Sequence, residues 1–290
     1  MEVRLEWADG LGRSREVKAA GLEAATQAEW EAAGPAREAA GVIDPGIIDE
    51  MAGLGFLGMT VPEETGGVGA DYTSYALALI EIAAADGAVS TMMSVHNAPF
   101  CAILQRFATP AQQEKWLKPA ARGEFIGCFA LTEPGTGTDA AAITSRARRT
   151  NHGYVLDGAK QFITSARIGG ATIVFAVTDP EAGKKGLSAF YVPQDTPGLT
   201  VGAPEHKLGQ KASDTCALGF EDMKLDHGAL IGEEGQGLAI ALSSLEAGRI
   251  GIASQSVGMA RAAMEAAIAY AQERESMGRK IIDHQAVAFR

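Results

Sequence analysis

From Leu238 to about Glu275 the sequence carries one unbroken helical period. Apolar side chains recur there at steps of three or four residues, at Ile250, Ala253, Val257, Ala260, Met264 and Ile268. A helix of this span would be about 55 Å long at 1.5 Å per residue. Because a helix gains most of its stability from burying one face, we expect this one to pack against partners of similar length, as in a helical bundle.

The N-terminal segment, residues 1–126, also has a helical pattern. Ala- and Glu-rich or periodic apolar stretches predict helices over residues 15–40, 46–59, 75–85 and 91–107. Thr109 followed by Pro110 has the residue types preferred at an N-cap and a first helical position, so a further helix is expected to begin there.

Residues 127–232 differ, because short apolar runs rich in Val, Ile, Phe and Thr alternate there with turn residues. Strands are expected over residues 153–158, 160–164, 172–178, 187–192 and 216–220, the first two joined by a turn at Asp157-Gly158. Strands this short and frequent predict an antiparallel barrel or sandwich. The expected fold class is α+β multidomain, with an N-terminal helical domain (1–126), a middle antiparallel β-barrel domain (127–232) and the first part of a C-terminal helical bundle (233–290).

Composition excludes several classes of protein. The formal net charge is -11 and no Lys/Arg cluster stands out, so no nucleic-acid partner is expected. Cys101, Cys128 and Cys216 are widely spaced among apolar residues, which favours buried free thiols over a disulfide framework or a metal site. Residues 1–10 lack a signal-type apolar run, and no 18-residue apolar stretch predicts a membrane span. A cytoplasmic location is the expectation.

Five short motifs carry chemical information. The first, over 131–139, reads LTEPGTGTD, in which two glycines permit close backbone approach to a ligand and threonine hydroxyls frame the loop. Taken alone it is equally a loop between strands. The other four motifs are KQFITS at 160–165, KLGQKASDT at 207–215, EAGRIGIA at 246–253, and RESMG at 274–278 followed by DHQ at 283–285.

Together and in this order, the motifs resemble those of the acyl-CoA dehydrogenase family, most closely its short-chain, butyryl-type members, over roughly residues 45–290. The resemblance implies an FAD-dependent oxidoreductase of fatty acid metabolism that desaturates a short-chain acyl-CoA. It also implies a homo-oligomer, a tetramer in the family, that passes electrons to an electron-transfer flavoprotein. Two other functions stay open: a non-enzymatic protein that binds flavin or CoA, and an acyl-CoA oxidase.

The resemblance assigns flavin contacts to residues of the first two motifs. It places Thr132 at the pyrimidine edge of the flavin, Phe162 against the isoalloxazine, where many relatives carry Trp, and Thr138 near both the pyrophosphate and the thioester. The remaining expected contacts of this group are Phe129, Leu131, Gly137, Ile163 and Thr164. Packing in the core of the sheet is the alternative for Phe162 and Ile163.

Residues of the last two motifs are assigned to more distant parts of the ligands. Arg274, Met277 and Gln285 match positions that reach the adenosine half of FAD in a neighbouring subunit; for Arg274 the alternative is a solvated helix end. Glu246 and Arg249 stand three residues apart and share one helix face. The resemblance places both at the CoA moiety, whereas the alternative is an exposed ion pair worth less than about 1 kcal/mol.

The expected reaction needs a carboxylate to take the α proton and a flavin to accept the β hydride. In most relatives the base is a Glu in a Tyr-Glu-Gly-Thr segment, which is expected beyond Arg290. A minority carry Glu directly before the Arg equivalent to Arg249, but that position is Gly248, and Glu246 lies about 200° around the helix from it. No catalytic residue is therefore identified, and the chain as given is expected to be truncated and inactive.

Overall fold

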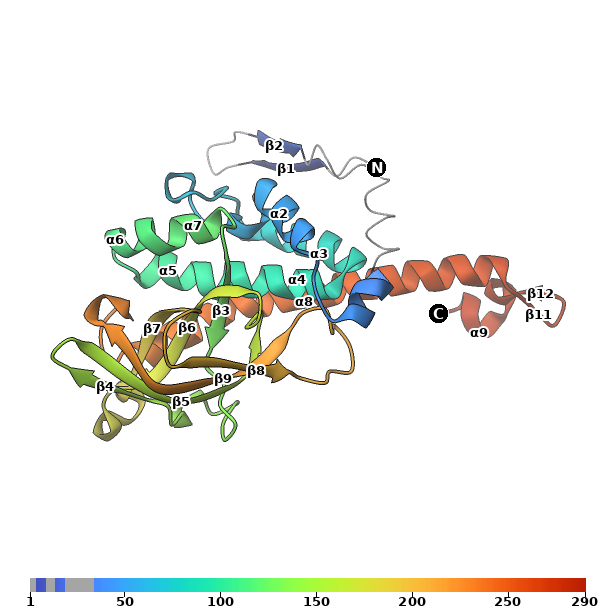
Figure 1. The fold of residues 1–290 in the computed structure, drawn as a ribbon. Coiled ribbons are helices and arrows are strands. Elements are labelled where there is room, and N and C mark those ends of the chain that lie inside the picture. The colour runs from blue at the N-terminus through green and yellow to red at the C-terminus, as the bar shows by residue number, and fades with distance from the viewer. Residues whose placement is uncertain (1–3, 9–13, 19–33) are drawn as a thin grey trace.

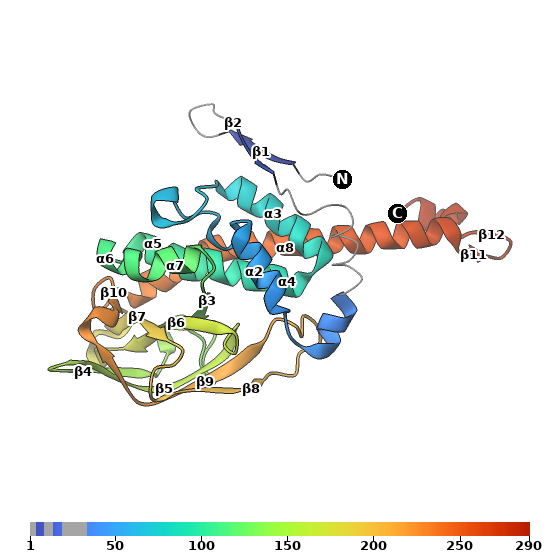
Figure 2. The ribbon, with the colours of Figure 1, turned by 45° about the horizontal axis from the view of Figure 1, so that its top comes forward.

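The computed structural model describes residues 4–8, 14–18 and 34–290. Figure 1 shows a layer of helices lying over a β-sheet, with one long helix, α8 (Gly237–Glu273), running beside both layers and projecting past them. The same arrangement is visible from the second direction (Figure 2). The order along the chain is helical segment, sheet, then the start of a second helical segment, which confirms the expected class at this level.

The helical layer consists of residues 34–40 and six helices that are joined by short 3-10 and π turns. The helices are α2 (Pro45–Gly53), α3 (Tyr72–Ala85), α4 (Gly87–Val95), α5 (Ala102–Phe107), α6 (Pro110–Gln112) and α7 (Lys118–Ala121). Side chains cap several N-termini. Thr109 caps α6 as predicted, and it forms a capping box with Gln112.

The prediction that a helix begins at residue 15 is wrong. Strand β2 (Ser14–Lys18) pairs antiparallel with β1 (Arg4–Ala8), so this part of the chain is a hairpin. Strand β1 alternates apolar and polar residues with period two, but β2 has a single apolar residue, Val17, so the hairpin has only a weak signal in the sequence beside the Ala- and Glu-rich stretch that follows. Of that stretch, residues 19–33 lie outside the described part of the chain.

The main sheet has the strand order β10-β7-β6-β4-β5-β9-β8. Strand β3 lies off this path and pairs with β6. Its strands are β3 (Ile126–Ala130), β4 (Arg146–Thr150), β5 (Gly153–Thr164), β6 (Gly169–Val177), β7 (Leu187–Pro193), β8 (Leu199–Pro204), β9 (Thr215–Asp226) and β10 (Leu230–Ile231). Because β3 pairs parallel to β6, the sheet is mixed, and the expectation of a purely antiparallel sheet is wrong. No pairing of β8 with β10 occurs among the described residues, so barrel closure is not confirmed.

The predicted turn at Asp157-Gly158 is also wrong, because β5 continues through it. The register against β9 shifts at this point, and the Asp157 side chain accepts a hydrogen bond from the amide of Asp222 (2.7 Å). A Cβ on Gly158 would lie 2.4 Å from the hydroxyl of Ser145, the residue before β4, so glycine is needed for this close approach and not for a hairpin.

Helix α8 spans the expected residues but buries a different face. It packs against α3 and α4 through small residues. A Cβ on Gly258 would stand 2.2 Å from the carbonyl oxygen of Ile80, and one on Gly251 would stand 2.3 Å from the hydroxyl of Ser94. The larger apolar residues of the predicted stripe, among them Val257 (55% exposed), point away from this contact. Close approach of the helix backbones, which only small residues permit, therefore decides the orientation.

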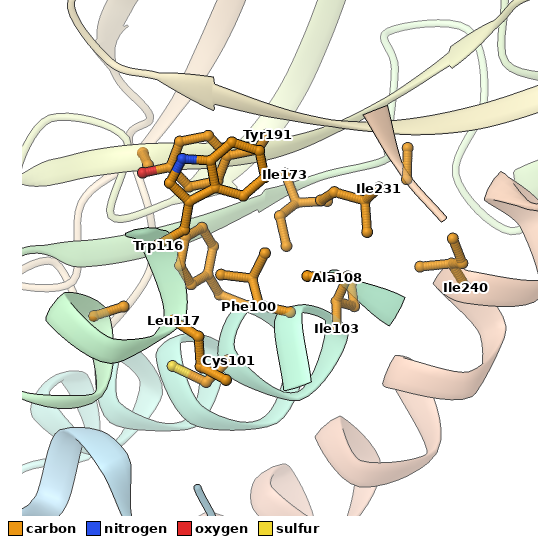
Figure 3. Packing of buried hydrophobic residues seen from close by; sticks show 14 of the residues in the cluster. Phe100, Cys101, Ile103, Ala108, Trp116, Leu117, Ile173, Tyr191, Ile231 and Ile240 are labelled. Atoms are coloured by element: carbon orange, nitrogen blue, oxygen red, sulfur yellow. The ribbon is translucent and has the colours of Figure 1, made fainter. Parts of the chain in front are cut away.

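Aromatic side chains join the helical layer to the sheet (Figure 3). Trp116 stacks on Tyr191 of β7 with ring centroids 4.1 Å apart and planes 4° from parallel. His96 fixes a second contact, because its Nδ1 accepts from the amide of Gly127 (2.9 Å) and its Nε2 donates to the carbonyl of Ala120 (3.0 Å).

Among the described residues, no helix is long and apolar enough to cross a membrane.

Candidate functional site

The loop that follows β3 is built around a tight turn. Glu133 and Thr136 exchange two backbone hydrogen bonds (2.9 and 3.1 Å), and the Thr136 hydroxyl donates to the carbonyl of Asp139 (2.7 Å). A Cβ at Gly135 would meet nothing within 4 Å, and one at Gly137 would meet only the methyl of Thr132 at 3.8 Å. The backbone of this loop is therefore open to an incoming ligand.

Phe162 is held in an unusual position near the end of β5. The register against β9 shifts between Lys160 and Ile163, because β5 has one extra residue there, and Phe162 has a positive φ of 59°. Such a bulge re-aims a side chain. Phe162 is 60% exposed, whereas Ile163 is 2% exposed and belongs to the core of the sheet. Core packing thus describes Ile163 but not Phe162.

Backbone hydrogen bonds bring the first three motifs together. The amide of Gln161 donates to the carbonyl of Thr132 (2.9 Å), which places the loop beside the bulge. The amide of Ser165 donates to the carbonyl of Asp214 (2.9 Å), which joins the third motif to the same strand end. The Thr132 hydroxyl makes no hydrogen bond with any described residue. The loop, the bulge and the third motif consequently lie together at one end of strand β5.

The other predicted residues of the first two motifs divide between surface and interior. Leu131 is buried in the core, and Phe129 is partly buried against Phe175, with ring centroids 5.2 Å apart. Thr138 is exposed on the open loop, and Thr164 is partly exposed in β5.

A buried ion pair that has no distinct signal in the sequence lies beneath this end of β5. Lys160 Nζ lies 2.8 Å from Glu133 Oε1, and the two side chains are 0% and 3% exposed. Burial opposes the charge on Glu133, but hydrogen bonds from Lys160 and Ser145 and the charge of Lys160 lower its pKa to about 2. Burial lowers the pKa of Lys160 to about 8, against the opposing effect of Glu133. Both groups are therefore ionised at neutral pH.

The predicted residues of α8 lie on its exposed surface. Glu246 and Arg249 are both exposed, and neither forms an ion pair with a described residue, so the exposed ion pair expected as the alternative is absent from the described part of the chain. Gly248 is partly buried, and a Cβ there would meet nothing within 4 Å.

Arg274 is the C-cap residue of α8, and the segment that contains Met277 and Gln285 follows it at the far end of this helix (Figure 1). There β11 (Glu275–Ser276) and β12 (Arg279–Lys280) form a small hairpin with Met277 in its turn, followed by α9 (Gln285–Ala288). Both views show this end projecting away from the sheet that carries Phe162 (Figures 1 and 2). Within one chain these residues are not brought together with the loop.

The fold and site define a protein that presents an aromatic ring and a hydroxyl-bearing, glycine-rich loop at one end of strand β5, which suits a flat ligand with polar edges. The sequence matches the acyl-CoA dehydrogenase N-terminal domain over residues 18–124, the middle domain over 128–223 and the C-terminal domain over 235–290. The chain belongs to the acyl-CoA dehydrogenase family, as the motifs predicted. The cofactor of this family of oxidoreductases is FAD.

Individual relatives agree with this placement. The chain is 44% identical over 243 residues to the mitochondrial short-chain specific acyl-CoA dehydrogenase of Bos taurus, covering 84% of this chain and 59% of that protein. The butyryl-CoA dehydrogenase structure from Megasphaera elsdenii matches with a TM-score of 0.87 and 37% identity, over 90% of this chain and 69% of that one. A glutaryl-CoA dehydrogenase from Mycobacterium smegmatis in complex with FADH2 matches with a TM-score of 0.82 and 31% identity, over 94% and 67%. The chain thus spans less than two thirds of the length of the curated bovine relative.

Proposed function

We propose that this chain holds FAD and a short-chain acyl-CoA for α,β-dehydrogenation of the thioester. The observation that carries the proposal is the bulge at Phe162, which exposes an aromatic ring directly beside the open loop at Thr132. An apolar ring that is 60% exposed gains from being covered, and the face of a flavin would cover it.

The residues present at this end of β5 fit a flavin. In the proposed arrangement Phe162 lies against the isoalloxazine, and the Thr132 hydroxyl, which has no partner among the described residues, bonds its pyrimidine edge. The open backbone at Gly137 and Thr138 accommodates the pyrophosphate. Thr164 and Phe129 extend the same wall. Leu131 and Ile163 support it from the core.

The acyl-CoA is proposed to lie between Thr138 and α8. Arg249 is exposed and without an ion-pair partner among the described residues, so its guanidinium is available to an anionic ligand. Glu246 lies on the same helix face. With these groups around the thioester and the CoA moiety, the α–β bond would be held over the flavin, and such positioning is a large part of the catalysis.

Held by Phe162, Thr132 and Thr138, a bound FAD would supply the acceptor for the β hydrogen, which leaves as hydride. Removal of the α proton requires a general base, and Gly248 leaves this chain without a carboxylate at the α8 position where some relatives carry one. We therefore assign no base to a described residue.

Arg274, Met277 and Gln285 are proposed to serve the adenosine half of FAD in a second copy of the chain. Their place at the projecting end of α8 supports this assignment, because this end lies away from the sheet that carries Phe162 in the same chain. A homo-oligomer is proposed accordingly, with an electron-transfer flavoprotein as the electron acceptor. An oxidase would differ by rapid reoxidation of its reduced flavin by oxygen, which stopped-flow absorbance would detect.

The threonine hydroxyls allow a direct test of the proposed site. Thr132→Val removes the hydroxyl assigned to the flavin and should raise the FAD dissociation constant about 2- to 12-fold, the effect of losing one hydrogen bond. Thr200→Val, at an exposed position of β8, is the matched control and should leave the constant unchanged. Equal constants for the Thr132 variant and the wild-type chain would remove Thr132 from the site.

A further inference from the structure

Beneath the proposed flavin site, Glu133 and Lys160 form a closed polar network. Glu133 Oε2 accepts from the amide and hydroxyl of Thr144 (2.6 and 2.8 Å), and Oε1 accepts from the amide of Ser145 (2.9 Å) and from Lys160 (2.8 Å). The Lys160 ammonium also donates to the carbonyl of Leu131 (3.1 Å). One carboxylate thus collects four donors from two separate segments.

Stability alone is a poor reason for such a pair. Removing two charges from water costs several kcal/mol per ion, and apolar residues of similar volume often replace a buried pair without loss. Buried charges that persist can instead fix one register between segments that could otherwise slide.

The network lies where register matters most for the proposed site. Glu133 directly follows Thr132, and Lys160 stands two residues before Phe162. Between these two contacts, the amide of Gln161 donates to the carbonyl of Thr132 (2.9 Å). Three adjacent loop residues, 131 to 133, are therefore tied to two adjacent residues of β5.

We propose that Glu133 and Lys160 are positioning residues, which lock the loop at Thr132 to the bulge at Phe162 so that both flavin contacts are aligned before FAD binds. This inference rests on the proposed flavin site. The pair itself does not touch the cofactor and takes no part in proton or hydride transfer. A preformed site binds more tightly, because less ordering is left to be done on binding.

The test uses Lys160→Met in the full chain. Glu133 keeps its three bonds from Thr144 and Ser145 in this variant, whereas the ties to Leu131 and Glu133 are lost. We expect the FAD dissociation constant to rise about 10-fold or more, because a loop released from this register is only partly in the arrangement that binds FAD. Glu133→Gln, which keeps the shape of the side chain, should give a change in the same direction.

The measurement separates positioning from simple stabilisation. Under conditions in which every variant is fully folded, unfolding does not contribute to the dissociation constant, so a merely stabilising pair would leave it unchanged. Glu81→Gln is the control, because it breaks the ion pair with Arg261 (2.6 Å) that joins α3 to α8 and should lower stability without changing FAD affinity. A wild-type constant in the folded Lys160→Met variant would overturn the inference.

Amide hydrogen exchange keeps the inference testable if the wild-type chain binds no FAD. That result would refute the proposed flavin site, but the lock would still be measured at the amide of Gln161. Lys160→Met should accelerate exchange of this amide about 10-fold or more, while Glu81→Gln should not. Unchanged protection of Gln161 would show that the pair does not hold the loop.

Discussion

The backbone at Phe162 should be strained, and a glycine at this position should relieve the strain. Its φ of 59° lies in the left-handed region, where a side chain costs about 1–2 kcal/mol and a glycine almost nothing. The residue is 60% exposed, so removing its side chain forfeits the burial of only about 80 Å² of apolar area, or about 2 kcal/mol. Phe162→Ala and Phe162→Gly both lose this burial, but only glycine also loses the strain.

The glycine variant should therefore be the more stable of the two, by about 1 kcal/mol once the greater entropy of glycine in the unfolded chain is subtracted. Urea unfolding without FAD measures the difference. Thr200 in β8, which has no positive φ, provides the control pair, and there alanine should be more stable than glycine by about 0.5–1 kcal/mol. A Phe162→Ala variant as stable as Phe162→Gly would refute the strained bulge.

Three further outcomes are expected. Gly258→Ala should destabilise the chain by about 1–3 kcal/mol through the contact with α3, whereas Gly248→Ala, with open space, should stabilise it by about 0.5–1 kcal/mol in urea unfolding. Arg249→Ala should weaken acyl-CoA binding by about 10- to 150-fold in calorimetry, and Arg261→Ala, on the same helix, should not. Burial lowers the pKa of His96 to about 4, so as the pH falls the unfolded chain takes up a proton before the folded chain does. The free energy of unfolding should therefore fall between about pH 6.5 and pH 4, by up to about 1.4 kcal/mol per pH unit. The fall should be smaller in His96→Gln.

Local signals in the sequence predicted much of the architecture. The span of α8 and the cap at Thr109 follow from residues that are neighbours in sequence, and both were predicted correctly, whereas the buried face of α8 was not. The glycine- and threonine-rich loop was also recognisable, because its motif is contiguous. The family followed from the order of such motifs along the chain.

Long-range geometry accounts for what could not be predicted. The parallel pairing of β3 with β6 leaves no mark in either strand. The outward face of α8 depends on how closely α3 approaches Gly251 and Gly258. A lysine within an apolar strand and a glutamate in a loop were each unremarkable in sequence, and only the fold joins Lys160 to Glu133. The missed elements are thus those that depend on residues distant in sequence.

The central claim is that FAD binds with its flavin ring on residue 162. Phe162→Trp places a fluorescent ring there, and titration with FAD should give saturable binding with quenching of the added tryptophan emission beyond that seen in the wild-type chain, at dissociation constants below about 100 µM. A folded Phe162→Trp variant that binds no FAD at about 100 µM, or binds it without the additional quenching, would contradict the proposed site.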